Sequence, residues 1–406
     1  MEAGSATRAG AETENATRSR VRYFAAGGEA EARRERGKGM EFDARRLERE
    51  ELRDLPVYSP GKSPEEAASE YGVSDCVKMA SNENPLGPSP LAVEAAKRAM
   101  SMAHVYPDPN CTKLREALSR RLGVPAECVL VGHGADEIFD LLAYAFLGRD
   151  DEIVVGDPTF TSYELAALTM GAKARKVPLR EYRQDIPAML DAMGARTKMV
   201  MLCSPLNPTG TTVRGGELEE MLGSLPRNVL LVLDEAYVEY VTDPDHPDAM
   251  AYFNRDPRLV VARTFSKIYG LAGLRVGYAV CHPTTREAME KVKLPFNVNR
   301  LAQEAALAAL EDEGHVRRSR EANERGKERL YRLFEELGIG YVPTQANFIL
   351  VKNGPFPDLF ERLLRHGVIV RAGEALGLPD HVRVTIGDEA QNDRLEKALR
   401  GIAGGG

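Results

Sequence analysis

Tryptophan is absent from this chain of 406 residues, and cysteine is scarce. The five cysteines are an odd number, lie far apart and include no Cys-x-x-Cys pair. This pattern argues against a disulfide framework and a thiolate metal site, and it indicates a reducing compartment, which we expect to be the cytoplasm. The cysteines are Cys76, Cys111, Cys128, Cys203 and Cys281.

Long apolar runs and an excess of positive charge are also missing. No apolar run approaches the length of a membrane span, and no signal peptide is visible. The formal net charge is −7, so we expect no general attraction to nucleic acid or to an anionic membrane. The sequence also lacks a cluster of His, Cys and Asp residues of the kind that binds a metal, so no metal is expected.

Large apolar side chains are rare in residues 1–40, which consist mainly of Ala, Gly, Glu and Arg. Such a segment cannot bury enough surface to offset chain entropy, so we expect a disordered tail. The rest is long enough for two domains. We expect an N-terminal segment over 41–86 that joins the small domain, a large domain over 87–298, and a small C-terminal α+β domain over 299–403.

Short apolar runs alternate with helical patterns through the middle of the chain. Runs that are apolar on both faces, with helices between them, predict a mostly parallel sheet of the α/β class, covered by helices on both sides. Ligands bind such sheets beyond the carboxyl ends of the strands. The expected strands are 128–131, 152–155, 174–177, 199–203, 229–233, 259–262 and 276–280.

Beyond residue 298 the pattern changes to two helices followed by a separate mixture of strands and helices. We interpret this part as the smaller domain. The expected helices are 300–311, 314–337, 357–366 and 391–402, and the expected strands are 347–351, 368–370 and 382–386.

A lysine, Lys267, stands at the exit of the expected strand 259–262, before a glycine-rich turn. Lysine forms a Schiff base with a carbonyl and becomes reactive when it is desolvated or lies beside another cation. Thr264, Ser266 and Arg275 are the donors that a phosphate dianion needs. Together they suggest pyridoxal phosphate. For an isolated Ser-Lys pair, a solvated loop lysine would be the better interpretation, but stretches upstream favour the cofactor.

The stretch from Gly132 to Glu137 connects an expected strand to the start of a helix. Free backbone N–H groups and the positive end of the helix dipole make such a turn an anion site. A lone Gly-x-Gly is weak by itself, since glycine often only ends a strand.

Asp234 ends another apolar run, and a carboxylate there needs a cationic partner. A protonated pyridine nitrogen can supply it. Opposite charges about 4 Å apart gain roughly 4 kcal/mol at an effective dielectric near 20, or about three pK units. The protonated ring is then the electron sink of the cofactor. A helix N-cap or a strand-end salt bridge explains Asp234 alone equally well.

Three further side chains can reach a flat ring. Tyr237 can donate a hydrogen bond to the ring hydroxyl, and Asn207, held between prolines, can reach the same oxygen. Phe160 can stack on the ring, although packing in the core is the commoner role of a phenylalanine. Asn-Pro commonly only starts a turn.

These motifs resemble the class I/II aminotransferases of pyridoxal-phosphate (PLP) fold type I. The match rests on Lys267 with Arg275, Asp234 with Tyr237, Asn207-Pro208-x-Gly210, Gly134-Ala135-Asp136 and Arg383. Within that group, three stretches resemble the histidinol-phosphate aminotransferases: Asn82-Glu83-Asn84-Pro85-Leu86-Gly87, Tyr106-Pro107-Asp108-Pro109 and Val382-Arg383-Val384-Thr385-Ile386-Gly387. The resemblance covers about residue 50 to the C-terminus. It implies a large domain with a mostly parallel seven-stranded sheet flanked by helices, plus a smaller α+β domain.

The resemblance also implies roles at the cofactor. Lys267 would be the Schiff-base lysine and the base that moves the proton, and Asp234 would pair with the pyridine nitrogen. Asn207 and Tyr237 would bond the ring oxygen, and Phe160 would stack on the ring where many relatives have tyrosine. The cofactor phosphate would lie among Gly134, Ala135, Asp136 (through its backbone N–H), Thr264, Ser266, Arg275 and, from the neighbouring subunit of a homodimer, Tyr106.

At the substrate, Arg383 and Arg371 would bind the anionic end, because the guanidinium fork accepts a carboxylate or a phosphate bidentately. Tyr58, Asn84 and Asn347 would complete the pocket. For Arg371 alone, a surface salt bridge is an alternative. The implied reaction is a ping-pong transfer of an amino group from L-histidinol phosphate to 2-oxoglutarate in histidine biosynthesis.

Three other functions remain open from the sequence. An aromatic amino acid aminotransferase would keep the chemistry and change the substrate, and a threonine-phosphate decarboxylase would release CO₂ and need no 2-oxoacid. A non-catalytic PLP-binding regulator would need an attached DNA-binding module, and residues 1–40 show no helix-turn-helix pattern.

Overall fold

The structure is a computed structural model, and it describes residues 42–53, 55, 64–73 and 75–404. The expected disordered tail over 1–40 and the expected substrate residue Tyr58 lie outside these residues. The chain divides into two units, one up to Arg49 and one from Glu50 to Gly406. In the first unit, Asp43 caps a short 3₁₀ helix, η2 (Ala44–Arg46), by accepting the N–H of Arg45.

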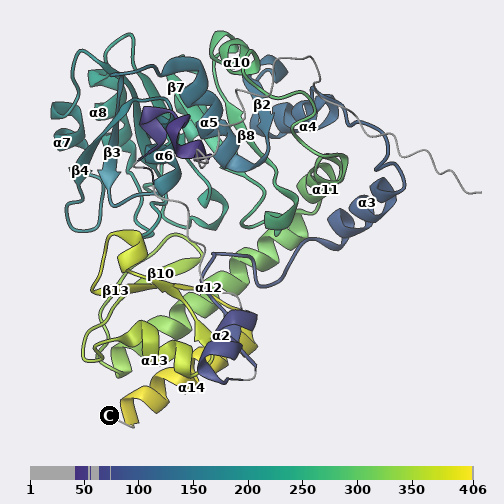
Figure 1. The fold of residues 1–406 in the computed structure, drawn as a ribbon. Helices are drawn as coiled ribbons and strands as arrows, with labels where there is room; N and C mark the ends of the chain where they lie inside the picture. Colours follow the sequence, from purple (N-terminus) through teal and green to yellow (C-terminus); the bar gives the residue numbers. More distant parts are fainter. Residues whose placement is uncertain (1–41, 54, 56–63, 74, 405–406) are drawn as a thin grey trace, which may run out of the picture. The chain divides into compact units, whose positions relative to one another are not determined.

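A seven-stranded sheet forms the centre of the second unit (Figure 1). Its strand order is β2-β8-β7-β6-β5-β3-β4. β8 is antiparallel to both neighbours, and the other strands are parallel to one another. The strands are β2 (Val129–Gly132), β3 (Glu152–Asp157), β4 (Lys173–Pro178), β5 (Thr197–Cys203), β6 (Leu230–Asp234), β7 (Leu259–Thr264) and β8 (Gly277–Val280).

Alternate residues of the central strands are buried on opposite faces of this sheet. On β6, Leu231 and Leu233 join one apolar cluster, and Val232 joins the other. The cluster with Val232 is completed by side chains from three helices, α5 (Gly134–Phe146), α6 (Thr161–Thr169) and α10 (Pro283–Glu290). The other cluster is completed by side chains from α4 (Thr112–Leu122), α7 (Ile186–Asp191), α8 (Gly215–Ser224), α9 (Ala249–Phe253) and α11 (Arg300–Glu311). Helices therefore cover both faces, which is why these strands are apolar throughout.

The edge strand β4 differs from the expectation that every strand is apolar on both faces. Lys173, Arg175 and Lys176 are exposed there, and Arg175 pairs with Glu152 at 2.6 Å. β4 has a neighbour on one side only, and charged side chains protect such an edge from pairing with another chain.

A smaller α+β body follows, built on a four-stranded antiparallel sheet of order β12-β13-β10-β9. In Figure 1 the long helix α12 runs from the large domain into this small one, where α2, α13 and α14 lie beside the sheet. Met79 packs into the apolar core beside this sheet. Its strands are β9 (Tyr341–Val342), β10 (Phe348–Lys352), β12 (Arg371–Ala372) and β13 (His381–Thr385), and β1 (Val77–Lys78) pairs with β11 (Val368–Ile369) in parallel.

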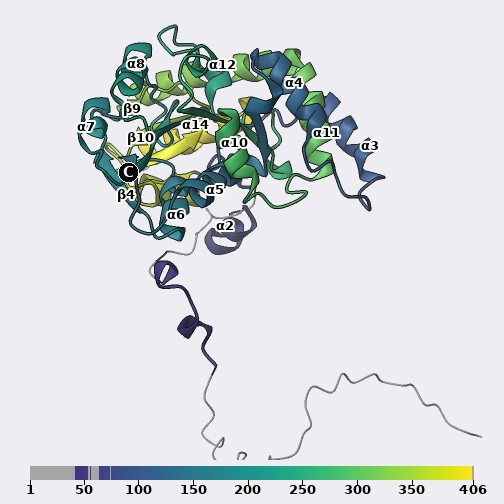
Figure 2. The same ribbon diagram turned by 90° about the horizontal axis from the view of Figure 1, so that it is seen from above.

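Beyond residue 298, α11, α12, α13 and α14 agree with the four expected helices to within two residues at each end. α3 lies alongside α11 in both views (Figures 1 and 2). The helices are α2 (Pro64–Tyr71), α3 (Pro90–Met100), α4 (Thr112–Leu122), α5 (Gly134–Phe146), α6 (Thr161–Thr169), α7 (Ile186–Asp191), α8 (Gly215–Ser224), α9 (Ala249–Phe253), α10 (Pro283–Glu290), α11 (Arg300–Glu311), α12 (Glu313–Glu336), α13 (Leu359–Arg365) and α14 (Glu389–Gly404). The short 3₁₀ turns of this unit are η3 (Glu50–Leu52), η4 (Ala126–Cys128), η5 (Val238–Tyr240), η6 (Ala272–Leu274) and η7 (Glu374–Leu376).

Candidate active site

A cavity of about 330 Å³ lies beyond the carboxyl ends of the parallel strands. Its size is typical of a small-molecule site. Twelve of the residues expected at the site line it, brought from β6, β7, α5, β12, β13 and the loops between them. They are Ala135, Asp136, Phe160, Asn207, Asp234, Tyr237, Thr264, Ser266, Lys267, Arg275, Arg371 and Arg383.

The amine of Lys267 points into this cavity from the turn after β7. Its Nζ donates to the carbonyl oxygen of Ser81 at 3.3 Å and lies 5.4 Å from the centre of the Tyr237 ring. Burial, together with the cationic Arg383, lowers the pKa of Lys267 to about 8. The lysine is therefore partly a neutral nucleophile near neutral pH, as Schiff-base chemistry requires.

The carboxylate of Asp234 is buried at the end of β6 and is 3% exposed. Its Oδ1 accepts the backbone N–H of Ala236 at 2.9 Å, and its Oδ2 accepts the hydroxyl of Tyr163. Burial raises the pKa of Asp234 to about 6, against the lowering effect of the Tyr163 hydroxyl. A carboxylate whose charge costs this much is stabilised by a cationic ligand.

An anion cradle lies between the start of α5 and the loop after β7. Arg275 adopts a left-handed conformation with φ of 56°, which turns its guanidinium toward Asp136 Oδ2 at 3.0 Å and Ser266 Oγ at 3.5 Å. Gly134 has φ of 80°, which strains other residues, and a Cβ there would lie 2.6 Å from the Arg275 guanidinium and push it away from the helix end. Thr264 Oγ1 adds a donor, 3.0 Å from Ser266 Oγ. Helix end, hydroxyls and guanidinium together suit a phosphate.

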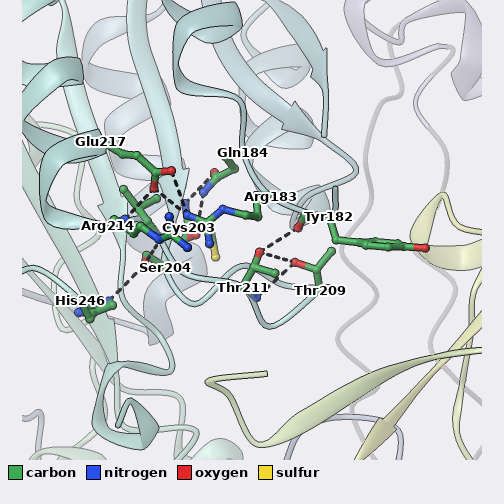
Figure 3. A network of polar contacts seen from close by, with 11 residues as sticks. Tyr182, Arg183, Gln184, Cys203, Ser204, Thr209, Thr211, Arg214, Glu217 and His246 are labelled. Atoms are coloured by element: carbon green, nitrogen blue, oxygen red, sulfur yellow. Dashed lines mark hydrogen bonds and ion pairs between the residues drawn. The ribbon is translucent and has the colours of Figure 1, made fainter. Parts of the chain in front are cut away.

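The loop from Ser204 to Val213 brings Asn207 to the cavity. Polar contacts hold this part of the chain in place, among them those of Gln184, Cys203 and Ser204 (Figure 3). The Gln184 side chain exchanges two hydrogen bonds with the backbone of Cys203, at 2.9 and 3.1 Å. Ser204 Oγ accepts the N–H of Val213 at 2.9 Å. The loop is therefore fixed at both ends, which sets the position of the Asn207 amide.

The two arginines expected at the substrate are neighbours across paired strands, because Arg371 of β12 lies opposite Arg383 of β13. Arg383 is 6% exposed and donates to Asn207 Oδ1 at 2.5 Å and to the carbonyl of Ala80 at 2.8 Å. Its guanidinium also lies 5.2 Å from the ring centre of Phe348. A fixed cation thus faces the cavity from the small domain.

Together these groups fit pyridoxal phosphate. The lysine, the buried carboxylate and the anion cradle supply what an aldehyde, a ring nitrogen and a phosphate need. Among the described residues, no group of three His, Cys, Asp or Glu side chains could hold a metal ion.

A family model described as aminotransferase class I and II matches residues 74–399. The chain belongs to the class I and II aminotransferases. Two curated relatives of this aminotransferase are similar over nearly their whole length. The histidinol-phosphate aminotransferase of Moorella thermoacetica is 50% identical over 356 residues, which make up 87% of this chain and 92% of the relative. Histidinol-phosphate aminotransferase 1 of Nitrosococcus oceani is 45% identical over 352 residues, 86% of this chain and 95% of the relative.

Solved structures share the aminotransferase fold. A histidinol-phosphate aminotransferase from Sinorhizobium meliloti, in complex with pyridoxal-5'-phosphate, superimposes with a TM-score of 0.81 at 26% identity, over 90% of this chain and 99% of that one. Aspartate aminotransferase from Thermus thermophilus with maleate gives 0.75 at 25% identity, over 86% and 99%. The predicted fold class, PLP fold type I with a smaller α+β domain, is confirmed.

Four described residues expected at the site, Gly134, Asn84, Asn347 and Tyr106, lie outside the cavity lining of this aminotransferase. Asn84 donates to the carbonyl of Ile268 at 2.7 Å, and Asn347 donates to the carbonyl of Asn82 at 3.0 Å, so both brace the loop before Leu86. Tyr106 is 74% exposed and stacks on Phe296, with ring centres 4.5 Å apart.

Sequence reasoning assigned no role to several residues that the fold brings to the site. Asn82 and Glu83 line the cavity, although the sequence had placed only Asn84 of this polar stretch at the site. Tyr163 reaches Asp234 from α6, three residues after Phe160. That spacing puts both aromatic rings on one side of the helix start, and their ring centres are 5.6 Å apart.

Proposed function

We propose that this aminotransferase binds pyridoxal 5'-phosphate and transfers the amino group of L-histidinol phosphate to 2-oxoglutarate, in histidine biosynthesis. The observation that carries the proposal is the Lys267 amine, which shares a cavity with the buried carboxylate of Asp234 and the anion cradle. The relatives at 50% and 45% identity, both named histidinol-phosphate aminotransferases, support the choice of substrate.

Each residue of the cavity has a part in this reaction. Bound to Lys267, the cofactor would supply an electron sink for the carbon that loses its proton. The Lys267 amine, once released by the substrate, would take the proton from the substrate Cα and return it to the neighbouring cofactor carbon. Asp234 would hold the proton on the ring nitrogen, and Asn207 and Tyr237 would bond the ring oxygen.

Phosphate and substrate would be held at opposite ends of the cavity. The backbone N–H groups of Ala135 and Asp136, the hydroxyls of Thr264 and Ser266, and Arg275 would bind the cofactor phosphate, while Phe160 would cover the ring face. Arg371 and Arg383 would bind the substrate phosphate in the first half-reaction and a carboxylate of 2-oxoglutarate in the second, since a guanidinium fork accepts either anion.

We also propose that the working unit is a homodimer in which Tyr106 reaches the cofactor phosphate of the partner subunit. Large apolar side chains are exposed near Tyr106, among them Met100 at 59% and Leu294 at 71%. An apolar groove of about 680 Å³ runs beside them, lined by Met100, Leu271 and Leu274 among others. Surfaces of this kind commonly mark a protein–protein contact.

A cytoplasmic location is part of the proposal. All five cysteines fall within the described residues and are unpaired, as is usual in a reducing compartment. No helix in the described part of the chain is long and apolar enough to cross a membrane.

The proposal is tested by single half-reactions followed through the absorbance of the bound cofactor. Histidinol phosphate, phenylalanine and phosphothreonine are each mixed with the enzyme, and histidinol phosphate is expected to convert the band fastest. Fast conversion by phenylalanine with none by histidinol phosphate would make the protein an aromatic aminotransferase. Release of CO₂ from phosphothreonine without a 2-oxoacid would make it a decarboxylase.

A further inference from the structure

Asn82 is a buried asparagine whose polar groups are all engaged. It follows β1, is 1% exposed and has a left-handed backbone with φ of 55°. Its Nδ2 donates to the hydroxyl oxygen of Tyr237 at 3.0 Å. Its backbone N–H donates to Thr385 Oγ1 at 2.9 Å, and its carbonyl accepts Asn347 Nδ2 at 3.0 Å.

The hydroxyl of Thr385 fixes which way round the Asn82 amide lies. Thr385 Oγ1 already accepts the backbone N–H of Asn82, and its own proton is donated to Asn82 Oδ1 at 3.0 Å. If the amide were turned over, that proton would face an NH₂ group and lose its acceptor, at a site where Thr385 is 6% exposed. The amide nitrogen is therefore directed at Tyr237.

This orientation decides what the Tyr237 hydroxyl can do. A lone pair of its oxygen is occupied by the Asn82 N–H, so its proton remains available for an acceptor in the cavity. An amide turned the other way would take that proton itself. Tyr237 is 3% exposed, so its hydroxyl has little access to bulk water as an alternative partner.

We propose that Asn82, held by Thr385, is a positioning residue that makes Tyr237 a hydrogen-bond donor to the ring oxygen of the cofactor. The proposal rests on the proposed function. It explains the residue type, because a left-handed backbone favours Gly, Asn or Asp. Glycine has no side chain, and aspartate would accept the Tyr237 proton, so only asparagine supplies the donor. Thr385 lies two residues after Arg383 on β13. This one strand would therefore position both Arg383 for the substrate and, through Asn82, Tyr237 for the cofactor.

The test is the pH at which the bound cofactor changes its absorbance. The deprotonated form carries negative charge on the ring oxygen, which a directed Tyr237 O–H stabilises. Asn82→Gly keeps the left-handed backbone and removes the amide, so its midpoint should rise by about one pH unit, a tenfold change in the equilibrium. Thr385→Val should move it the same way by less. Tyr237→Phe should move it at least as far, and adding Asn82→Gly to that variant should move it no further.

Thr197→Val is the matched control for Thr385→Val, because it removes a buried hydroxyl that accepts the N–H of Gly194 at 2.9 Å, at the start of β5. It should lower the melting temperature and leave the midpoint unchanged. An unchanged midpoint in Asn82→Gly, or shifts that add in the double variant, would overturn the proposal. If Asn82→Gly does not fold, the midpoint of Thr385→Val decides. A wild-type protein that stays colourless with pyridoxal phosphate would instead overturn the proposed function, and this inference with it.

Discussion

At the scale of single residues, the site consists of ionisable groups whose pKa values are moved by burial. Lys267 and Asp234 are shifted in opposite directions, and in both cases the neutral form is favoured. Each shift disfavours the charged form of the group and so favours its interaction with a ligand. The neutral lysine is a nucleophile, and a cationic ligand would keep the carboxylate ionised.

Loading of the apoprotein with pyridoxal phosphate should follow the titration of Lys267. With a pKa of about 8, roughly half of the amine is neutral at pH 8, against under about 1% for an ordinary lysine at that pH. The rate at which the cofactor band grows should therefore rise with pH to a midpoint near 8. Arg383→Gln removes a cation that contributes to the shift and should move the midpoint upward. A wild-type midpoint near the ordinary 10.5 would contradict the assignment, and Lys267→Ala should give no band.

Asp234→Asn should stabilise the apoprotein while it abolishes transamination. Because the folded-state pKa is raised from 3.8 to about 6, the folded protein keeps a proton that the unfolded chain releases between these values. Stability is therefore lost as pH rises through this window, by up to about 3 kcal/mol at 1.36 kcal/mol per unit. The variant carries no charge at position 234 and should have a higher melting temperature than wild type at pH 7. The difference between the two melting temperatures should disappear below pH 4.

Asp256→Asn is the control of opposite sign for that melting experiment. Hydrogen bonds from Arg258, at 2.6 and 2.9 Å, hold the pKa of Asp256 below its usual value. This carboxylate contributes stability above its unfolded pKa, so its replacement should lower the melting temperature at pH 7. If both substitutions changed the melting temperature in the same direction, the assigned pKa of Asp234 would be wrong.

At the scale of elements, the ends of the strands determine where the site lies. The end of β5 is held by a side chain, that of Gln184. Beyond Met201, β5 no longer pairs with β3, and the Gln184 side chain takes the place of a strand for the backbone of Cys203. The cis peptide bonds of this region lie before Pro158, Pro205 and Pro208. Asn207 follows four residues after Cys203, so its position depends on this substitute pairing.

Gln184→Leu should therefore weaken both the fold and cofactor binding. It leaves the N–H and the carbonyl of Cys203 buried without partners, at a cost of about 1–3 kcal/mol for each. Thermal unfolding should show the loss, and titration with pyridoxal phosphate should show a lower affinity than wild type. Gln184→Glu keeps an acceptor for the N–H of Cys203. Its stability and its affinity for the cofactor should therefore lie between those of wild type and Gln184→Leu. Wild-type affinity in Gln184→Leu would show that the loop holds Asn207 without this contact.

The strand ends could be predicted from the sequence because the information is local. The apolar run of β6 stops at Asp234, and that of β5 stops before Ser204, and parallel strands place such ends along one edge. The antiparallel direction of β8 could not be predicted, because it depends on how the turn around Arg275 reverses the chain. The exposed charges of β4 follow from its position at the edge of the sheet, and the apolar periodicity of a sequence does not reveal that position.

The contacts of Asn82 and Tyr163 could not be predicted from the sequence for a different reason. Asn82 meets Thr385 across 303 residues of chain, and Tyr163 meets Asp234 across 71. Each pair consists of side chains that are common in turns and helices, so nothing in either stretch points to its partner. The expected domain limits at residues 86 and 298, and the roles of Asn84 and Asn347, stay predictions.

At the scale of the whole molecule, the site is incomplete in one subunit if Tyr106 acts on the partner. Tyr106 stacks on Phe296 and is largely exposed, while Lys267 lies in the cavity of its own chain. In a shared site, Tyr106 and Lys267 of one chain would serve two different cofactors. Variants of these two residues can therefore complement each other only in a mixed dimer.

Mixing of an inactive variant with a weakly cofactor-binding variant tests this arrangement. Lys267→Ala should be inactive, and Tyr106→Ala should bind the cofactor more weakly, by about tenfold or more if one charge-assisted hydrogen bond of about 1.5–3 kcal/mol is lost. After the two are unfolded together and refolded at equal concentration, about half of the dimers should be mixed, each with one site that has both native residues. Activity at limiting cofactor should then rise well above that of either variant refolded alone. Sedimentation should give the mass of a dimer, and Tyr144→Ala, another exposed tyrosine, should behave as wild type. A mixture no more active than the average of its parts would show that each subunit builds its site alone.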